Sequence, residues 1–115
     1  IQPELILSKN IEVFFYDDSA KVQSTLYSRN AEINQQTKIM SAKNNVILIS
    51  SDGKKLETEE LIWDQLNNKI YTEKKVKIIT GKEIIFGKGF ASSPDFSKYE
   101  INNINGIFDF KNESN

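Results

Sequence analysis

The sequence predicts an all-β fold built from stacked hairpins. Short runs rich in Val, Ile, Tyr, Phe and Thr alternate with turn-forming pairs, and no apolar stripe of helical period competes with them. Similar segments also recur at intervals of roughly 30 residues, which is typical of stacked repeats. Strands are expected at residues 11–16, 22–33, 37–50, 55–65, 68–79, 83–91 and 98–109.

Each expected strand ends at residues that favour a turn. Asn, Asp and Gly tolerate the backbone conformations of tight turns, and Pro94 lies between two runs, where its missing N–H breaks no ladder. The first strand carries the aromatic run Phe14-Phe15-Tyr16, which we expect to pack the first strands together. In chain order the turn-forming segments are Asp17-Asp18, Asn34-Gln35-Gln36, Asp52-Gly53, Asn67-Asn68, Thr80-Gly81, Ser92-Ser93-Pro94-Asp95 and Asn105-Gly106.

The length and composition fit one ordinary domain. The chain has 115 residues, of which 38% are hydrophobic and 27% are charged, and this is enough for a single core. We expect that domain to span residues 1–110. The remaining residues, 111–115, offer nothing to bury and are expected to form a flexible tail.

Several function classes are disfavoured by composition. With 15 basic and 16 acidic residues the net charge is −1, so no overall field attracts nucleic acid. The chain has no Cys and no His, which excludes disulfides, thiol catalysis, a Ser-His-Asp triad and histidine metal sites. Neighbouring carboxylates such as Glu59-Glu60 point to opposite faces of a strand and cannot act on one substrate. We therefore expect no enzyme and no cofactor.

The repeats contain a break in their alternation that predicts a bend. Leu26-x-Ser28-x-x-Ala31-x-Ile33 matches Leu56-x-Thr58-x-x-Leu61-x-Trp63 and Ile85-x-Gly87-x-x-Phe90-x-Ser92. In each copy the apolar positions change parity after the small third residue. Since side chains alternate along a strand, the apolar face stays inward only if the strand bulges there. Bends at equivalent places predict V-shaped hairpins that form two facing antiparallel sheets.

The inner face of the V is the candidate binding site. Alternation places Glu57, Glu59, Lys69, Tyr71, Lys75 and Lys77 on the outside. If the sheets close, the inner residues form an ordinary core, whereas an open V leaves an apolar trough; the sequence leaves both possibilities open. The inner set in this region is Leu56, Leu61, Trp63, Ile70, Val76 and Ile78.

Taken in order, these motifs resemble the LptC family of the Gram-negative lipopolysaccharide transport machinery. The resemblance covers roughly residues 3–108, and Gly-x-Gly-Phe favours LptC over the related bridge protein. The first sheet segment looks shortened relative to the family. The motifs that carry the resemblance are Asn45-Val46, Asp52-Gly53, Leu56-x-Thr58-x-x-Leu61-x-Trp63-Asp64, Lys69-Ile70-Tyr71-Thr72, Val76-x-Ile78, Gly87-x-Gly89-Phe90 and Tyr99-x-Ile101.

The resemblance implies a fold, a ligand and partners. It implies a twisted, V-shaped β-jelly roll of the OstA-like kind that holds lipid A acyl chains in an apolar groove. It also implies transfer from an inner-membrane ABC transporter of the LptB/LptF/LptG type to an LptA-like bridge protein that joins by edge-strand addition. Such proteins are periplasmic, and we expect an inner-membrane anchor preceding the given sequence. The implied lipid-binding residues are Leu56, Leu61, Trp63, Ile70, Val76, Ile78 and Phe90, and the implied partner edge is Tyr99, Ile101 and Ile104.

One alternative from another class remains open. A secreted carbohydrate-binding or adhesion module would stack sugars on exposed aromatic rings. Whether the four tyrosines line one exposed face or scatter distinguishes the two hypotheses. The tyrosines are Tyr16, Tyr27, Tyr71 and Tyr99.

Overall fold

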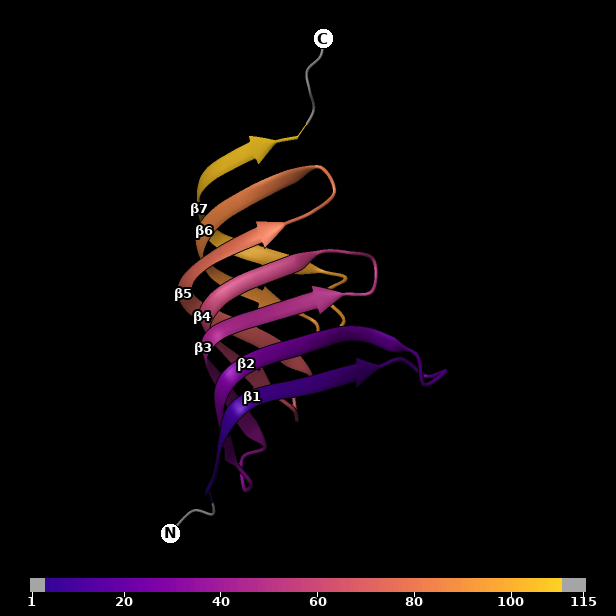
Figure 1. Ribbon diagram of the computed structural model, residues 1–115, viewed down its shortest axis with the longest axis vertical. Coiled ribbons are helices and arrows are strands. Elements are labelled where there is room, and N and C mark those ends of the chain that lie inside the picture. The colour runs from indigo at the N-terminus through magenta and orange to yellow at the C-terminus, as the bar shows by residue number, and fades with distance from the viewer. Residues whose placement is uncertain (1–3, 111–115) are drawn as a thin grey trace.

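The computed structural model describes residues 4–110 and consists of strands joined by turns (Figure 1). All seven strands form one antiparallel sheet in chain order, so the all-β prediction is confirmed. No helix occurs in this part of the chain, and hence none that is long and apolar enough to cross a membrane. The strands are β1 (Glu4–Tyr16), β2 (Val22–Asn34), β3 (Ile39–Ser50), β4 (Lys55–Asp64), β5 (Lys69–Ile79), β6 (Glu83–Ser92) and β7 (Tyr99–Asp109).

Every pair of neighbouring strands shifts its register near the middle, as the parity breaks predicted. The shifts in the three repeats fall between Tyr27 and Asn30, between Thr58 and Ile62, and between Phe86 and Gly87. Extra residues at such shifts bend the strands and fold the sheet over on itself. The two facing layers are thus halves of one hydrogen-bonded sheet, which refines the expectation of two separate sheets.

The first strand is longer than predicted, because a bulge hides its beginning. Lys9 and Asn10 have positive φ angles of 75° and 57°, and the register with β2 shifts between Ser8 and Ile11. Residues 4–8 therefore belong to the strand, but they lie beyond the bend. The prediction that the first strand begins at Ile11 is therefore wrong, whereas the expected tail at 111–115 lies outside the described residues.

One turn-forming pair does not form a turn. Asn105-Gly106 lies within β7, which continues through it to Asp109. Gly106 pairs with Phe86 in the ladder between β6 and β7. The pair therefore adds no break to the sheet.

The bends divide the sheet into two layers, and the apolar space between them is called the slot here. Each strand contributes one half to each layer, and successive strands continue both layers. The first layer comprises residues 11–16, 22–27, 46–50, 55–58, 76–79, 83–87 and 104–109. The second layer comprises residues 4–8, 30–34, 39–43, 61–64, 69–72, 88–92 and 99–103.

Aliphatic side chains form a continuous row across the inner face of the first layer. Directly paired residues supply it strand by strand, because residues opposite each other in a ladder point to the same face. Its central members are buried, and so burial of aliphatic surface from several strands holds the two layers together. The row runs Val13, Leu26, Leu48, Leu56, Ile78, Ile85 and Ile107.

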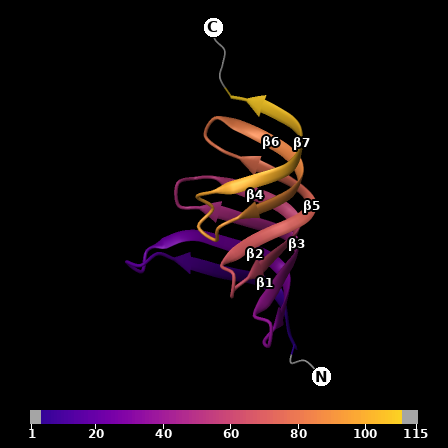
Figure 2. The same ribbon diagram turned by 180° about the vertical axis from the view of Figure 1, so that it is seen from behind.

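The two layers are offset along the molecule rather than stacked strand over strand. Phe15 of β1 in the first layer meets Trp63 of β4 in the second, with ring centroids 4.8 Å apart. Ser24 of β2 reaches the carbonyl oxygen of Pro94, in the loop after β6. Sheet twist causes such an offset, and Figures 1 and 2 show the end of β7 projecting beyond the strands behind it.

Candidate functional site

The seven residues predicted to line the interior lie together in the slot. Six of them are at most 3% exposed, and Trp63 is half-buried and packs against the same cluster. Their strand neighbours Glu57 and Lys77 lie on the opposite face and are partly exposed. The prediction of inner and outer faces is therefore confirmed, whereas lipid binding at these residues stays a prediction. The six are Leu56, Leu61, Ile70, Val76, Ile78 and Phe90.

The middle of the slot is filled by the protein's own side chains. Leu48, Leu56 and Ile78 in the first layer and Leu61 and Ile70 in the second are each at most 1% exposed. Of the two possibilities left open by the sequence, the structure shows the layers closed at this point. An acyl chain can occupy this region only if the layers separate or if a side chain leaves.

Aromatic residues close the side of the slot opposite the bends, which we call the mouth. Phe15 and Trp63 meet edge to face there, and Phe15 also lines a surface hollow of about 330 Å³ together with Asn68 and Pro94. The Trp63 Nε1 atom is buried without a hydrogen-bond partner among the described residues. The mouth thus combines closely packed rings with one unsatisfied donor.

Phe96 also belongs to this closure, and no pattern in the sequence predicted it. It lies in the β6–β7 loop (residues 93–98), yet its side chain is fully buried. Its ring packs edge to face on Phe90 at 5.6 Å and on Tyr99 at 5.4 Å. Strand alternation cannot reveal an inward-pointing loop residue; the only signal is one large apolar side chain in a polar segment.

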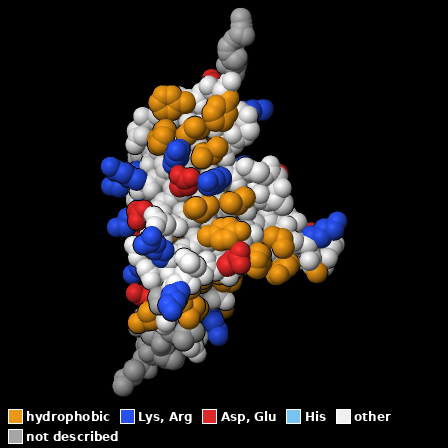
Figure 3. All heavy atoms as spheres, in the orientation of Figure 1, with side chains coloured by type: hydrophobic (Ala, Val, Ile, Leu, Met, Phe, Trp, Pro, Cys, Tyr) orange, Lys and Arg blue, Asp and Glu red, His pale blue; other side chains and the backbone are white. Residues whose placement is uncertain are grey.

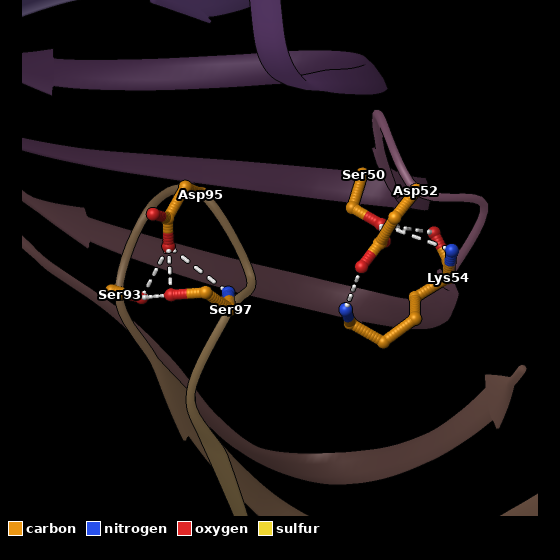
Figure 4. A network of polar contacts seen from close by, with 6 residues as sticks. All are labelled: Ser50, Asp52, Lys54, Ser93, Asp95 and Ser97. Atoms are coloured by element: carbon orange, nitrogen blue, oxygen red, sulfur yellow. Dashed lines mark hydrogen bonds and ion pairs between the residues drawn. The ribbon is translucent and has the colours of Figure 1, made fainter. Parts of the chain in front are cut away.

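Two polar networks lie side by side at the mouth (Figure 4). In the β3–β4 turn, Asp52 accepts hydrogen bonds from the Ser50 hydroxyl and from Lys54 Nζ, the latter at 2.7 Å. Lys54 first and Ser50 second lower the pKa of Asp52 from 3.8 to about 2. Charge-assisted bonds of this kind favour the ionised carboxylate and fix the conformation of the turn.

The second network organises the β6–β7 loop. The Asp95 carboxylate accepts hydrogen bonds from the Ser93 hydroxyl at 2.6 Å and from the Ser97 amide at 3.0 Å. The Ser93 bond is the main cause of a lowered pKa for Asp95. The loop therefore has a conformation of its own, stabilised mostly by contacts within it.

The C-terminal end of the slot is open. Among residues 4–110, β7 pairs only with β6, so the other side of this strand presents free backbone groups. Ile104 and Ile107 lie opposite inner-face residues of β6 but are 53% and 52% exposed. Hydrophobic side chains gather near this end on the face shown in Figure 3. The apolar interior thus continues to the surface at β7.

The predicted partner edge lies on this strand, but its three side chains differ. Ile104 is exposed, whereas Ile101 is half-buried against the core cluster. Tyr99 stacks on Phe90 at 6.0 Å and is also half-buried. At Tyr99 and Ile101 the backbone, rather than the side chain, is therefore available to a partner.

Two glycines allow β6 and β7 to approach closely at the bend. A Cβ atom on Gly87 would lie 2.5 Å from Ile101 Cγ2 and 2.8 Å from the Asn103 carbonyl oxygen. Gly89 has a φ angle of +85°, which favours glycine. The expected bend or close backbone approach at these glycines is confirmed.

The four tyrosines do not share one exposed face. Tyr27 pairs with Ile47 in the first layer and Tyr71 pairs with Ile62 in the second, so they lie on different layers. Tyr99 packs into the core between Phe90 and Phe96, and Tyr16 is exposed at the end of β1. This arrangement does not favour the carbohydrate-binding alternative.

A folded-over antiparallel sheet with an apolar interior and unpaired edge strands defines an OstA-like β-jelly roll. The family model of LptC, described as lipopolysaccharide-assembly, LptC-related, matches residues 3–103. The chain therefore belongs to the LptC family, as its motifs predicted, and has a role in lipopolysaccharide transport.

A solved structure has the same fold. LptH from Pseudomonas aeruginosa is described as the LptA homologous periplasmic component of the conserved lipopolysaccharide transport device. It matches with a TM-score of 0.59 at 10% identity, covering 89% of this chain and 83% of that chain. None of the curated proteins compared matches this sequence. At this low identity the likeness to LptH shows the fold alone.

Proposed function

We propose that this chain is a non-enzymatic carrier that holds the acyl chains of lipid A between its two layers during lipopolysaccharide transport. The observation that supports this most directly is the aliphatic inner row, which is continuous from β1 to β7 and emerges at the open end. Family membership agrees with this role. The binding surface comprises Leu56, Leu61, Trp63, Ile70, Val76, Ile78 and Phe90.

Hydrophobic transfer supplies the binding energy in this proposal. Each acyl CH₂ removed from water contributes about 0.8 kcal/mol, so a dozen contribute about 10 kcal/mol before other terms. The layers must separate to admit the chain, which costs part of their own packing, and association costs more. The resulting moderate affinity suits a protein that must release its cargo. The energy for directed movement comes from the ATP-hydrolysing transporter.

The unpaired edge of β7 is the surface proposed for the bridge protein. A strand of an LptA-like partner can add to the free backbone groups at Tyr99, Ile101 and Ile104. Because Ile104 and Ile107 are exposed at the same end, the added unit would also extend the apolar interior. An acyl chain could then pass between units without crossing water.

The cellular setting follows from the same proposal. The chain would act in the periplasm, held at the inner membrane, and would receive lipopolysaccharide from an ABC transporter of the LptB/LptF/LptG type. No catalytic constellation supports an enzymatic role, since the sequence has no His and no Cys. Tethering to the membrane and the identity of the transporter stay predictions from the family.

Site-specific photo-crosslinking in cells tests lipid binding with matched positions. A photoreactive amino acid at Ile78 or Leu61 faces the slot, whereas one at the neighbouring Lys77 or at Glu57 faces outward. We expect crosslinks to lipopolysaccharide at the first pair only. Equal labelling of both pairs, or labelling of the outward pair alone, would contradict the proposed binding surface.

A further inference from the structure

The β6–β7 loop places one aromatic side chain inside the slot at its mouth. Phe96 is fully buried although its backbone belongs to a loop, and its φ angle of 64° is unusual for a residue other than glycine. Its ring rests on Phe90, which is one of the proposed acyl-binding residues. Phe96 therefore fills space next to Phe90 that an acyl chain could take.

A hydrogen bond and a cation–π contact join this loop to the facing layer. The Ser24 hydroxyl donates a hydrogen bond to the Pro94 carbonyl oxygen at 2.5 Å, and it joins residues 70 positions apart. Lys54 Nζ lies 5.6 Å from the centre of the Phe96 ring, within the range of a cation–π interaction. Both contacts connect the loop to the first layer across the mouth.

The loop can keep its shape while these cross-mouth contacts break. Within it, Asp95 binds Ser93 and Ser97, and the Phe96 amide donates to the Ser93 carbonyl oxygen at 2.9 Å. None of these bonds crosses the mouth. Opening would therefore break the Ser24–Pro94 hydrogen bond and the Lys54–Phe96 contact and would expose the buried Phe96 ring, without unfolding the loop.

We propose that Phe96 is a removable plug and that the β6–β7 loop is the latch that controls access of acyl chains to the slot. The inference rests on the proposed function, because it assigns regulation of the same site. The acyl chain replaces the Phe96 ring against Phe90 and Tyr99, so the apolar surface that the ring covers there stays shielded from water. A surface hollow lies next to this loop, lined by Phe15 and Pro94 and also by polar residues such as Gln23 and Asp95.

A reversible crosslink across the mouth tests the latch, and the absence of native cysteine makes it specific. The double variant Ser24→Cys/Pro94→Cys ties the loop to the first layer at the observed hydrogen bond. The matched control Ser93→Cys/Ser97→Cys joins two hydroxyl positions 3.4 Å apart within the loop and does not cross the mouth. Binding of purified lipopolysaccharide is measured by the fluorescence of Trp63, the single Trp, in oxidised and reduced protein.

We expect the oxidised cross-mouth variant to bind lipopolysaccharide at least about tenfold more weakly than its reduced form. The disulfide removes the population of molecules with an open loop, which is the form that admits acyl chains. The loop-internal variant should bind equally in both states. A third variant, Phe96→Ala, removes the plug without a crosslink and should raise the association rate several-fold.

The outcomes separate the two proposals. Equal binding by the oxidised and reduced cross-mouth variant, with no change of rate in Phe96→Ala, would overturn the latch and leave acyl binding intact. Failure of the wild type and of all variants, including Phe96→Ala, to bind lipopolysaccharide would overturn the proposed function and the latch with it. Binding by Phe96→Ala alone would support the plug.

Discussion

The two ends of the slot are built from similar residues but differ in their exposure to solvent. At the β1 end of the first layer, Phe15 is 9% exposed and packs on Trp63. At the β7 end, Ile107 continues the same inner face yet is 52% exposed. Both residues face inward by strand register, opposite Ser24 and Ile85 respectively. The difference therefore does not arise from alternation along the strands.

The offset between the layers explains the difference. The second layer is displaced toward β1 and β2, as the contacts of Phe15 with Trp63 and of Ser24 with Pro94 show. It covers the first layer there and leaves the β7 end uncovered. A continuous apolar face thus serves as a core at one end and as an exposed surface at the other. Exposed apolar surface of this kind is typical of interaction sites.

The largest effect is expected from matched truncations within the inner row. Ile78→Ala removes a fully buried side chain and should destabilise the fold by about 2–5 kcal/mol. Ile107→Ala, in the same row at the open end, should change the free energy of unfolding by no more than about 0.5 kcal/mol. Urea unfolding followed by circular dichroism measures both. Similar destabilisation in the two variants would show that the β7 end is covered as well.

The next largest effect concerns the bend at the open end. In Gly87→Ala the new methyl group collides with Ile101 and with the Asn103 backbone, which should cost about 1–3 kcal/mol. Gly81→Ala is the control, because a Cβ atom there meets nothing within 4 Å and should have little effect. Thermal unfolding compares the two. Equal melting temperatures would mean that β6 and β7 are farther apart than the structure shows.

Local sequence rules could predict most of the fold, because they depend on one strand at a time. Six strands and all the turns between strands follow from β-formers and turn residues. The parity breaks predict where β2, β4 and β6 bend, although the register places the extra residue in the partner strands β3, β5 and β7. The start of β1 could not be predicted, because Lys9 and Asn10 give no strand signal and form the bulge themselves. Alternation across that bulge is interrupted, which hides residues 4–8.

The site was predictable only where strand alternation defines it. Leu61 and Ile78 face inward as expected, but whether the V is open or closed depends on how one layer lies over the other. That offset arises from the summed twist of all seven strands, which no single residue encodes. Phe96 was missed for the same reason, since its burial depends on a facing layer far away in sequence.

A smaller effect is expected on assembly, and it tests the open end alone. Ile104→Lys places a charge on an exposed position of the edge strand, which opposes strand addition. Affinity for a purified LptA-like bridge protein should fall about tenfold, while stability changes by no more than about 0.5 kcal/mol. Leu66→Lys, at an exposed position in the β4–β5 turn, is the control. Unchanged affinity in Ile104→Lys would locate the partner surface elsewhere.

The smallest effect is acid sensitivity at the mouth. The pKa of Asp52 is lowered from its ordinary 3.8 to about 2. The ionised carboxylate therefore stabilises the fold at pH values above its ordinary pKa, and this contribution is lost as the pH falls toward about 2. The carboxylate is exposed, so solvent screening keeps the contribution small. The stability difference between wild type and Asp52→Asn should be constant down to about pH 4 and then shrink.

Urea midpoints at successive pH values measure this difference, and amide exchange locates it. The Phe96 amide, bonded to Ser93, should lose protection below about pH 4 before the Thr80 amide, which bonds to Glu83 in the β5–β6 turn. The lowered pKa of Asp95 acts in the same direction, because its protonation weakens the bonds from Ser93 and Ser97. Simultaneous loss at both amides would mean that acid unfolds the whole sheet and that the mouth is no weaker than the rest.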